Sequence, residues 1–169
     1  MFRSIMSSQS SCIFCQICDK TSPATIYYED EEVLVFKDIY PVTDFHMLCI
    51  PKNHIRSVKC LSKEDKPLLE KLISVGKQAL LDNGGTEDDL LMGFHWPPFN
   101  SVNHLHLHII SPASKMNFLH RQMFRTGSFW FVTSDYALEY IQNKLWYGIK
   151  RAAYKFKEER LLGRRIYIH

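Results

Sequence analysis

Apolar residues along the chain recur at two spacings, which predict both strands and helices. Residues 26–28, 33–36 and 45–50 are short runs rich in β-branched and aromatic side chains, a composition typical of strands. Pro51 ends the third run, because proline has no N–H to donate to a sheet. A fourth run at 90–94 also predicts a strand.

The clearest predicted helix lies between the third and fourth runs. Ser62 and Asp65 resemble a capping box, and Pro67 defines the start only to within a turn. Gly84 and Gly85 end the helix. Its apolar stripe at helical spacing consists of Leu68, Leu69, Leu72, Ile73, Val75, Ala79 and Leu80.

A second helix is predicted within residues 129–147, which begin as extended chain and become helical after a Ser134/Asp135 cap. Because the strands come as antiparallel neighbours, the elements predict an α+β fold rather than an alternating βαβ chain. We expect an antiparallel sheet of about five strands with one long helix and a C-terminal helix.

Length and composition are consistent with one domain. The chain has 169 residues, of which 46% are hydrophobic, enough for a sizeable core. We place the domain at 12–142, after a flexible polar lead-in at 1–11 and before a basic tail at 143–169 that is helical in part. No stretch approaches 18 uninterrupted apolar residues, so no membrane span is expected.

Charge divides the chain unevenly. Residues 144–169 hold eight Lys/Arg and two acidic residues, a charge of +6, and the net charge of +3 therefore leaves −3 for the rest. Two interpretations of the tail stay open. It is either a solvated amphipathic helix or a surface that contacts nucleic acid or anionic lipid.

The five cysteines indicate a reducing compartment. The lead-in has no apolar segment typical of a secretory signal, so reduced thiols or metal ligands are expected rather than disulfides. We expect the protein in the cytoplasm, with the nucleus as a second compartment.

The stretch "SVNHLHLHIISP" carries the most informative polar pattern. His104, His106 and His108 alternate with apolar residues, and a strand directs alternate side chains to opposite faces. We therefore expect the three rings on one face, either solvated or lining a cleft. Three interpretations compete at this point: a harmless row of surface histidines, a metal site that uses all three rings, or a catalytic site.

Catalysis would use the neutral imidazole ring. Its ordinary pKa of about 6.5 leaves an unprotonated nitrogen available at neutral pH. Attack on phosphorus would form a phosphoramidate intermediate and split one displacement into two. A neighbouring ring could fix the tautomer of the nucleophile, and another could protonate the leaving atom.

The motif "HLHLHII" resembles the signature of the histidine triad family, in which three histidines alternate with apolar residues. The segments "CIFCQI" and "VLVFKDIYPVTDFHMLCIPKNH" precede it in the family's order, so the resemblance covers about residues 12–140. It is strongest for the Hint branch, particularly its third mammalian type. The segment "MGFHWPPFNSVNHLHLHIISP" is also similar to aprataxin. The resemblance implies a histidine triad fold and a homodimer with a sheet continued across the interface.

The resemblance also assigns roles to individual residues. His106 would be the nucleophile that accepts a nucleoside monophosphate, His108 would contact the phosphate and assist the leaving group, and His46 would neighbour the nucleophile. Ser101 would sit near the phosphate as a fourth member of the catalytic set. The nucleotide-binding residues implied in this way are Asp38 for the ribose, Ile39, Phe36, Ile13, Phe14 and Ile17 for the base, and Asn100, Ser101, His106, Leu107 and His108 around the phosphate.

Two details refine the implied chemistry. The third triad position is His108 rather than the glutamine of the uridylyltransferase-like branch, which favours water as the acceptor of the second step. The loop "HWPPFNS" replaces the glycine-bearing loop that the Hint branch usually has before its serine. His95, just before this loop, lies outside the motif; it is interpreted as a partly exposed histidine, and a position lining the site stays open as the alternative.

The pair Cys12 and Cys15 raises the question of zinc. Taken alone, the C-x-x-C spacing fits a metal pair or incidental cysteines. Some triad proteins with this pair bind a structural zinc through two further histidines, and the matching positions are His54 and His104. The resemblance thus implies a Cys2His2 site for structural Zn²⁺ in which His104 is a metal ligand rather than a catalytic group.

The function implied is hydrolysis of the P–N bond of adenosine 5′-monophosphoramidates, or of related aminoacyl-adenylates, through a covalent AMP–histidine intermediate. A purine nucleotide is the expected substrate, with no organic cofactor. Two alternatives stay open: aprataxin-like removal of AMP from nucleic-acid 5′ ends, and a nucleotide-binding interaction module with weak catalysis.

Overall fold

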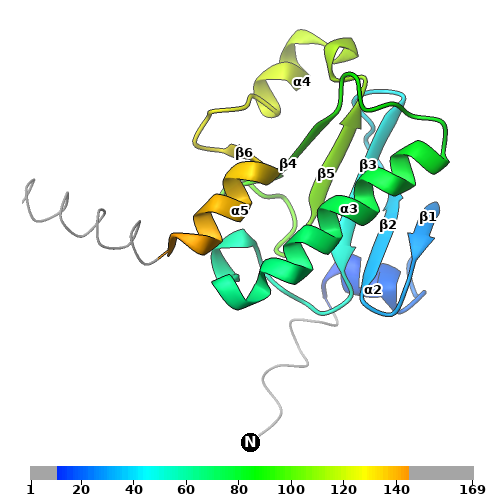
Figure 1. Cartoon of the computed structure of the whole chain (residues 1–169). Helices are drawn as coiled ribbons and strands as arrows, with labels where there is room; N and C mark the ends of the chain where they lie inside the picture. Colours follow the sequence, from blue (N-terminus) through cyan, green and yellow to red (C-terminus); the bar gives the residue numbers. More distant parts are fainter. Residues whose placement is uncertain (1–10, 145–169) are drawn as a thin grey trace, which may run out of the picture.

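The computed structural model describes residues 11–144, and the lead-in at 1–10 and the tail at 145–169 lie outside the described residues. The described chain forms one antiparallel sheet in the strand order β1-β2-β3-β5-β4-β6 (Figure 1). The strands are β1 Ile26–Glu29, β2 Val33–Lys37, β3 Phe45–Pro51, β4 Leu91–His95, β5 Leu107–Ser111 and β6 Phe131–Thr133. The α+β class predicted from the sequence is confirmed, with six strands rather than about five.

Both faces of the central strands are buried, which explains their continuous apolar runs. The side chains of β2 at Val33 and Val35 lie in the cluster under the long helix, α3 Lys66–Asp82, together with Met47 and Ile109. The alternate residues, such as Leu34, belong to a second cluster against α2 Ile13–Cys18. Figure 1 shows α3 lying across one face of the sheet and α2 near the opposite end from α4 Phe118–Met123.

The start of α3 follows the predicted capping box. A short 3-10 turn, η2 Lys63–Asp65, precedes the helix, and the backbone N–H and hydroxyl of Ser62 both donate to Asp65 Oδ2 at 2.8 and 2.9 Å. Pro67 sits in the first turn, where its missing N–H costs nothing. Gly84, which has a positive φ of 85°, follows the helix end.

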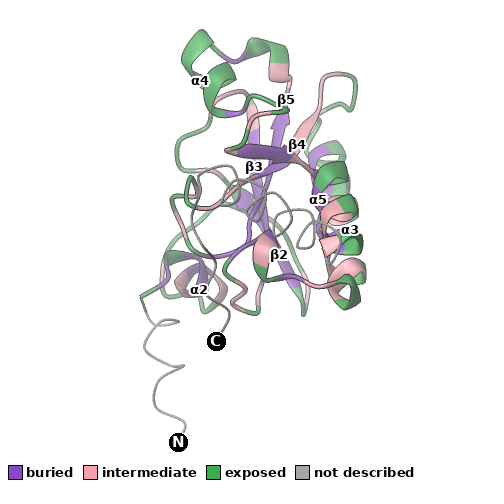
Figure 2. Cartoon of the chain, turned by 90° about the vertical axis from the view of Figure 1, so that its left-hand side faces the viewer, coloured by how far each residue is buried: buried purple, intermediate pink, exposed green. Residues whose placement is uncertain are grey.

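The C-terminal helix is α5 Ser134–Gln142, and its cap differs from the prediction. Thr133 Oγ1 accepts the N–H of Tyr136 at 3.2 Å, so Thr133 rather than Ser134 or Asp135 caps the helix. The helix packs beside α3. Figure 2 shows both helices with an exposed outer side and a buried inner side. No helix among residues 11–144 is long and apolar enough to cross a bilayer.

The histidine segment departs from the expected strand. β5 begins only at Leu107, so His108 lies in the strand while His104 and His106 lie in the loop before it. The three rings are also not on a wet face, because each is at most 6% exposed. The loop is held by the N–H of Leu105, which donates to Ile55 O at 2.6 Å. Because His104 and His106 lie in a loop rather than in a regular strand, the three rings can point to different sets of neighbouring residues.

Candidate active site and metal centre

His106 has one ring nitrogen fixed by the backbone. Its Nδ1 lies 2.6 Å from the carbonyl oxygen of His104, and a carbonyl only accepts, so Nδ1 carries the proton. The lone pair of the neutral ring is then on Nε2. Burial lowers the pKa of His106 to about 4, which keeps the ring neutral at physiological pH. Geometry and desolvation thus both prepare Nε2 as a nucleophile.

His46 and His108 form a directed hydrogen-bond relay. The N–H of Val42 donates to His46 Nδ1 at 3.4 Å, which places the proton of His46 on Nε2. His46 Nε2 lies 2.9 Å from His108 Nδ1, so it donates to that atom. His108 must then carry its own proton on Nε2.

The Nε2 atom of His108 is buried without a hydrogen-bond partner among the described residues. An unpartnered buried donor costs free energy unless a ligand completes it. The rings of His108 and His106 are 5.0 Å apart, so an acceptor held between them could contact both. Burial lowers the pKa of His108 well below its ordinary value and that of His46 to about 4.

Asp38 stands at the end of the relay. Its Oδ2 is 3.5 Å from His46 Nε2, and its Oδ1 accepts the N–H of Tyr40 at 2.8 Å. Burial raises the pKa of Asp38, while the Tyr40 N–H and the nearby His106 oppose that rise. Asp38, His46 and His108 lie close enough to hold a metal ion. His46 Nε2 and His108 Nδ1 are already hydrogen-bonded to each other, so we interpret the group as a relay.

Several residues predicted to bind the nucleotide surround this centre. Phe14 packs edge-on against His106 and Phe36, with ring centroids 5.3 and 5.4 Å apart. Ile39 is 81% exposed and Ile13 is 41% exposed, so both apolar surfaces are open to a ligand. Ile17 is buried in the α2 cluster.

Leu107 is placed differently from its expected role. Its side chain is fully buried in the core under α3, which leaves only its backbone to contact a nucleotide. Ser101 is exposed in the loop that follows β4. Beside it, Asn100 Nδ2 donates to Val102 O and to Asn103 Oδ1 at 3.1 and 2.9 Å, which leaves the side-chain oxygen of Asn100 available.

Two further residues join the histidine cluster. His95 is partly exposed, as interpreted, and it also lies beside the triad, the alternative left open: its ring is 5.0 Å from that of His108, and its Nδ1 lies 3.4 Å from Trp130 O. Phe124 is 4% exposed and packs edge-on against His46 and His108. The position of His95 at the end of a predicted strand beside the triad was the only signal. Nothing in the sequence around Phe124 distinguished it from other aromatic residues.

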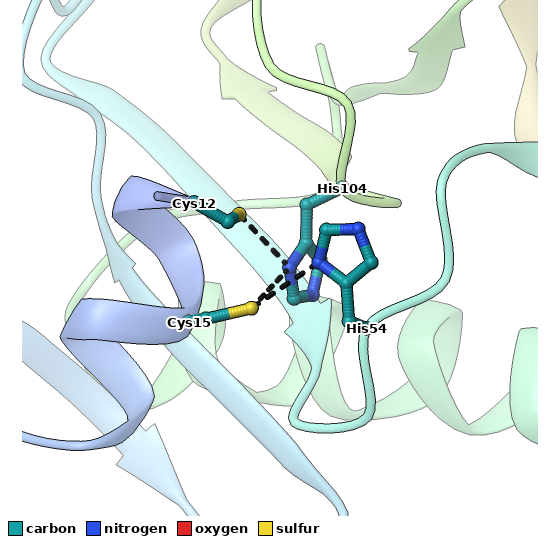
Figure 3. A group of neighbouring side chains, drawn as sticks. All are labelled: Cys12, Cys15, His54 and His104. Carbon is teal, nitrogen blue, oxygen red and sulfur yellow. Dashed lines mark hydrogen bonds between the residues drawn. The ribbon is translucent and has the colours of Figure 1, made fainter. Parts of the chain in front are cut away.

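A second group of side chains gathers Cys12, Cys15, His54 and His104, whose ligand atoms all lie within 4.8 Å of one another (Figure 3). His104 Nδ1 is 3.5 Å from each sulfur, and His54 Nδ1 is 3.2 Å from the Cys15 sulfur. A tetrahedral zinc with Zn–S of about 2.3 Å and Zn–N of about 2.0 Å places sulfur and nitrogen about 3.5 Å apart. The donor set and its spacing therefore fit zinc.

The tautomer of His104 also suits a metal ligand. His104 Nε2 lies 2.8 Å from Pro51 O and donates to it, so Nδ1 presents its lone pair to the two sulfurs. Such a carbonyl partner behind a ligating ring is the usual way that proteins orient metal-bound histidine. His104 therefore has different partners from His106 and His108, because its Nδ1 faces the two sulfurs rather than the other two rings.

Comparisons with known proteins agree with this arrangement. A family model described as "Scavenger mRNA decapping enzyme C-term binding" matches residues 11–124. Among solved structures, a HIT family hydrolase from Clostridium thermocellum is 34% identical with a TM-score of 0.56, covering 59% of this chain and 89% of that one. The chain belongs to the histidine triad family.

Within the family, two of the similar curated proteins carry the same name. The chain is 42% identical over 134 residues to the adenosine 5′-monophosphoramidase HINT3 of Xenopus tropicalis, covering 78% of this chain and 88% of that protein. The mouse protein of the same name, from Mus musculus, is 43% identical over 133 residues, covering 77% of this chain and 81% of that protein. A Zn-bound histidine triad family protein from Mycobacterium smegmatis is 28% identical with a TM-score of 0.53, covering 65% of this chain and 82% of that chain.

Proposed function

We propose that the protein is a nucleotide hydrolase that cleaves the P–N bond of adenosine 5′-monophosphoramidates. The observation that carries the proposal is the hydrogen bond from His106 Nδ1 to His104 O, at 2.6 Å, because it directs the lone pair of Nε2 toward the substrate side. Relatives 42% and 43% identical over most of their length are named adenosine 5′-monophosphoramidases, which supports the same reaction.

In the first step, His106 Nε2 attacks the α-phosphorus and forms an N–P bond as the bond to the amine breaks. Binding of the anionic phosphate favours uptake of one proton by the His46–His108 pair, and the pair then passes the Nε2 proton of His108, the unpartnered donor beside the nucleophile, to the leaving amine and becomes neutral. His46, which donates to His108 Nδ1, stabilises the tautomer that makes this donation feasible. The anionic phosphate stabilises positive charge on the rings during the transfer.

In the second step, water attacks the same phosphorus and the bond to His106 breaks, which releases AMP. The deprotonated Nε2 of His108 accepts the proton of this water and returns to its starting state. Asp38, beside the cluster and partly buried, is suited to accept hydrogen bonds from the ribose hydroxyls. Phe14 and Phe36, together with the exposed Ile39, supply apolar surface for a purine base.

The metal set supplies structure rather than chemistry. Bound Zn²⁺ would link α2, the connection after β3 and the loop before β5, and so fix the carbonyl of His104 that orients His106. The geometric fit of the four ligands and the Zn-bound neighbour support zinc at this position. We also propose a homodimer, as in the family resemblance, and its mass in solution is the test.

The proposal is tested with His106→Ala and a fluorogenic adenosine phosphoramidate. Wild type should turn the substrate over, and the variant should lose at least about 10³-fold in kcat, because no other group can form the intermediate. Acid-quenched wild type should carry AMP on His106. Equal rates for the two proteins would contradict the enzyme assignment and favour a nucleotide-binding module instead.

Removal of AMP from nucleic-acid 5′ ends stays the second candidate. Its support is a relative named aprataxin from Ciona intestinalis, 30% identical over 118 residues, but the chain spans only 30% of that protein. The basic tail that motivated it lies outside the described residues. Among residues 11–144, no observation favours a nucleic-acid substrate over a small phosphoramidate.

A further inference from the structure

The loop from Trp96 to Ser101 brings Asn100 close to the nucleophile His106, because both residues line the same small cavity. Two of its residues are prolines, which have no N–H, and it contains no glycine. Its backbone makes one internal turn, in which the N–H of Phe99 donates to Trp96 O at 2.9 Å. Its position must therefore be fixed by contacts with other segments.

A small cavity beside His106 is the space that this loop helps to enclose. Its volume of about 10 Å³ is at the lower limit for holding one water. Its lining includes Ser57 and Val58 from one segment and His95 and Asn100 from another. The placement of these two segments relative to each other therefore sets the room available next to the nucleophile.

Lys59 connects these two segments. It follows Val58 in the turn η1 Val58–Cys60, and its Nζ donates to Pro97 O, in the loop that carries Asn100, at 2.9 Å. The same ammonium lies 5.1 Å from the ring centroid of Trp96, a cation–π contact. The hydrogen bond is part-buried, so water replaces it less well than at a free surface.

Lys144, just after α5, holds the turn in place. Its Nζ donates to Lys59 O within η1 and to Leu61 O directly after it, both at 2.8 Å. The Trp96 ring is also held by α5, because the Tyr140 ring packs edge-on against it at 4.9 Å. The loop, the turn and the end of α5 thus form one continuous set of contacts.

We propose that Lys59 is a positioning residue that holds the 96–101 loop at the correct distance from His106. The inference rests on the proposed hydrolase function. Lys59 touches no reacting atom in this assignment. It acts through Pro97 and Trp96 on the placement of Asn100 and Ser101, and a misplacement of about 1 Å in such groups costs about 10²-fold in rate.

The test compares Lys59→Met, which keeps the apolar stem, with Lys59→Arg, which keeps the charge and the donors. The matched control is Lys63→Met, whose side chain is 75% exposed and pairs only with Glu64 at 3.8 Å among the described residues. With the phosphoramidate substrate, Lys59→Met should lower kcat/KM by about 10- to 100-fold. Lys59→Arg should recover most of the activity, and Lys63→Met should match wild type.

A substrate-free measurement separates this inference from the function itself. Amide hydrogen exchange at Phe99 to Val102 should rise in Lys59→Met and stay unchanged in Lys63→Met, while exchange in the β3 core stays as in wild type. Lys144→Met should give a smaller rise in the same amides. If wild type were inactive, the exchange result would still test the positioning role. Unchanged exchange and kinetics in Lys59→Met, or activity lost only in proportion to unfolded protein, would overturn it.

Discussion

At the scale of single residues, three histidines in one alternating motif have three different kinds of partner. His104 directs Nδ1 to two sulfurs, His106 donates its Nδ1 proton to a carbonyl, and His108 accepts from His46. Each partner fixes which nitrogen carries the proton, and the proton position decides what the ring can do. The hydrogen-bond partner of each ring, rather than the motif alone, therefore decides which of its nitrogens is available to react or to bind a metal.

The relay predicts a specific effect of changing His46. His46→Ala removes the donor to His108 Nδ1, so His108 can adopt the tautomer that lacks a proton on Nε2. We expect kcat to fall about 10²-fold while nucleotide affinity changes little, because proton transfer to the amine is the step affected. His46→Gln, whose amide can still donate, should retain more activity. Single-turnover kinetics with good and poor leaving amines check this.

The loss of activity in His46→Ala should depend on how basic the leaving amine is. An amine that needs little protonation should be nearly insensitive to His46→Ala, whereas a basic amine should show the full loss. An equal loss for both amines would contradict the assignment of His108 as the proton donor.

Several of these residues were accessible from the sequence, and others were not. The motif and its resemblance brought together His46, His106 and His108 and also the four metal ligands, and the structure places both sets within contact distance. The tautomers could not be predicted, because they depend on carbonyls such as Pro51 O and His104 O that only the folded backbone positions. The choice between the two interpretations of His95 depended on the fold in the same way.

At the scale of elements, short segments account for the differences between prediction and structure. The long helix was predictable because its apolar stripe is long, and the central strands were predictable because both of their faces are buried and their apolar runs are continuous. β6 has three residues and α4 has six, too short for a periodic signal. α2 is also six residues long, with no side-chain cap, and its place on the sheet depends on the packing of Phe14 and Ile17.

α2 also leads to the prediction for the metal centre. Cys15→Ser should reduce bound zinc from about one equivalent to under about 0.2, because the ligand set loses a thiolate. If zinc is present at 100 times its Kd, its loss costs about 2.7 kcal/mol, or roughly 5–10 °C in Tm at this size. Metal analysis and thermal unfolding of protein purified without added zinc measure both effects.

The chain offers a matched control in the same helix. Cys18→Ser changes the last residue of α2, which does not belong to the four-ligand group. It should keep the zinc content and lose less thermal stability than Cys15→Ser. Zinc content that is equally low in wild type, or equally high in Cys15→Ser, would contradict the site.

At the scale of the whole molecule, the site makes the fold sensitive to acid. Phe124 and α4 close over the histidines, and burial lowers the pKa of His46 from its ordinary 6.5 to about 4. The unfolded chain therefore binds more protons than the folded chain between these values. The stability that comes from keeping His46 neutral is complete above about pH 6.5 and is lost as the pH falls toward 4.

The size of this pH-dependent loss of stability can be measured with one substitution. Between pH 7 and pH 5, His46 alone should lower the free energy of unfolding by about 2 kcal/mol, from the pKa values of 6.5 and about 4. Urea unfolding of wild type and His46→Gln at both pH values measures this. The variant should lose about 2 kcal/mol less, and any loss from the zinc ligands cancels because both proteins keep them. Parallel losses in the two proteins would mean that His46 is not held neutral by burial, and that the closed histidine cluster opens well before the fold does.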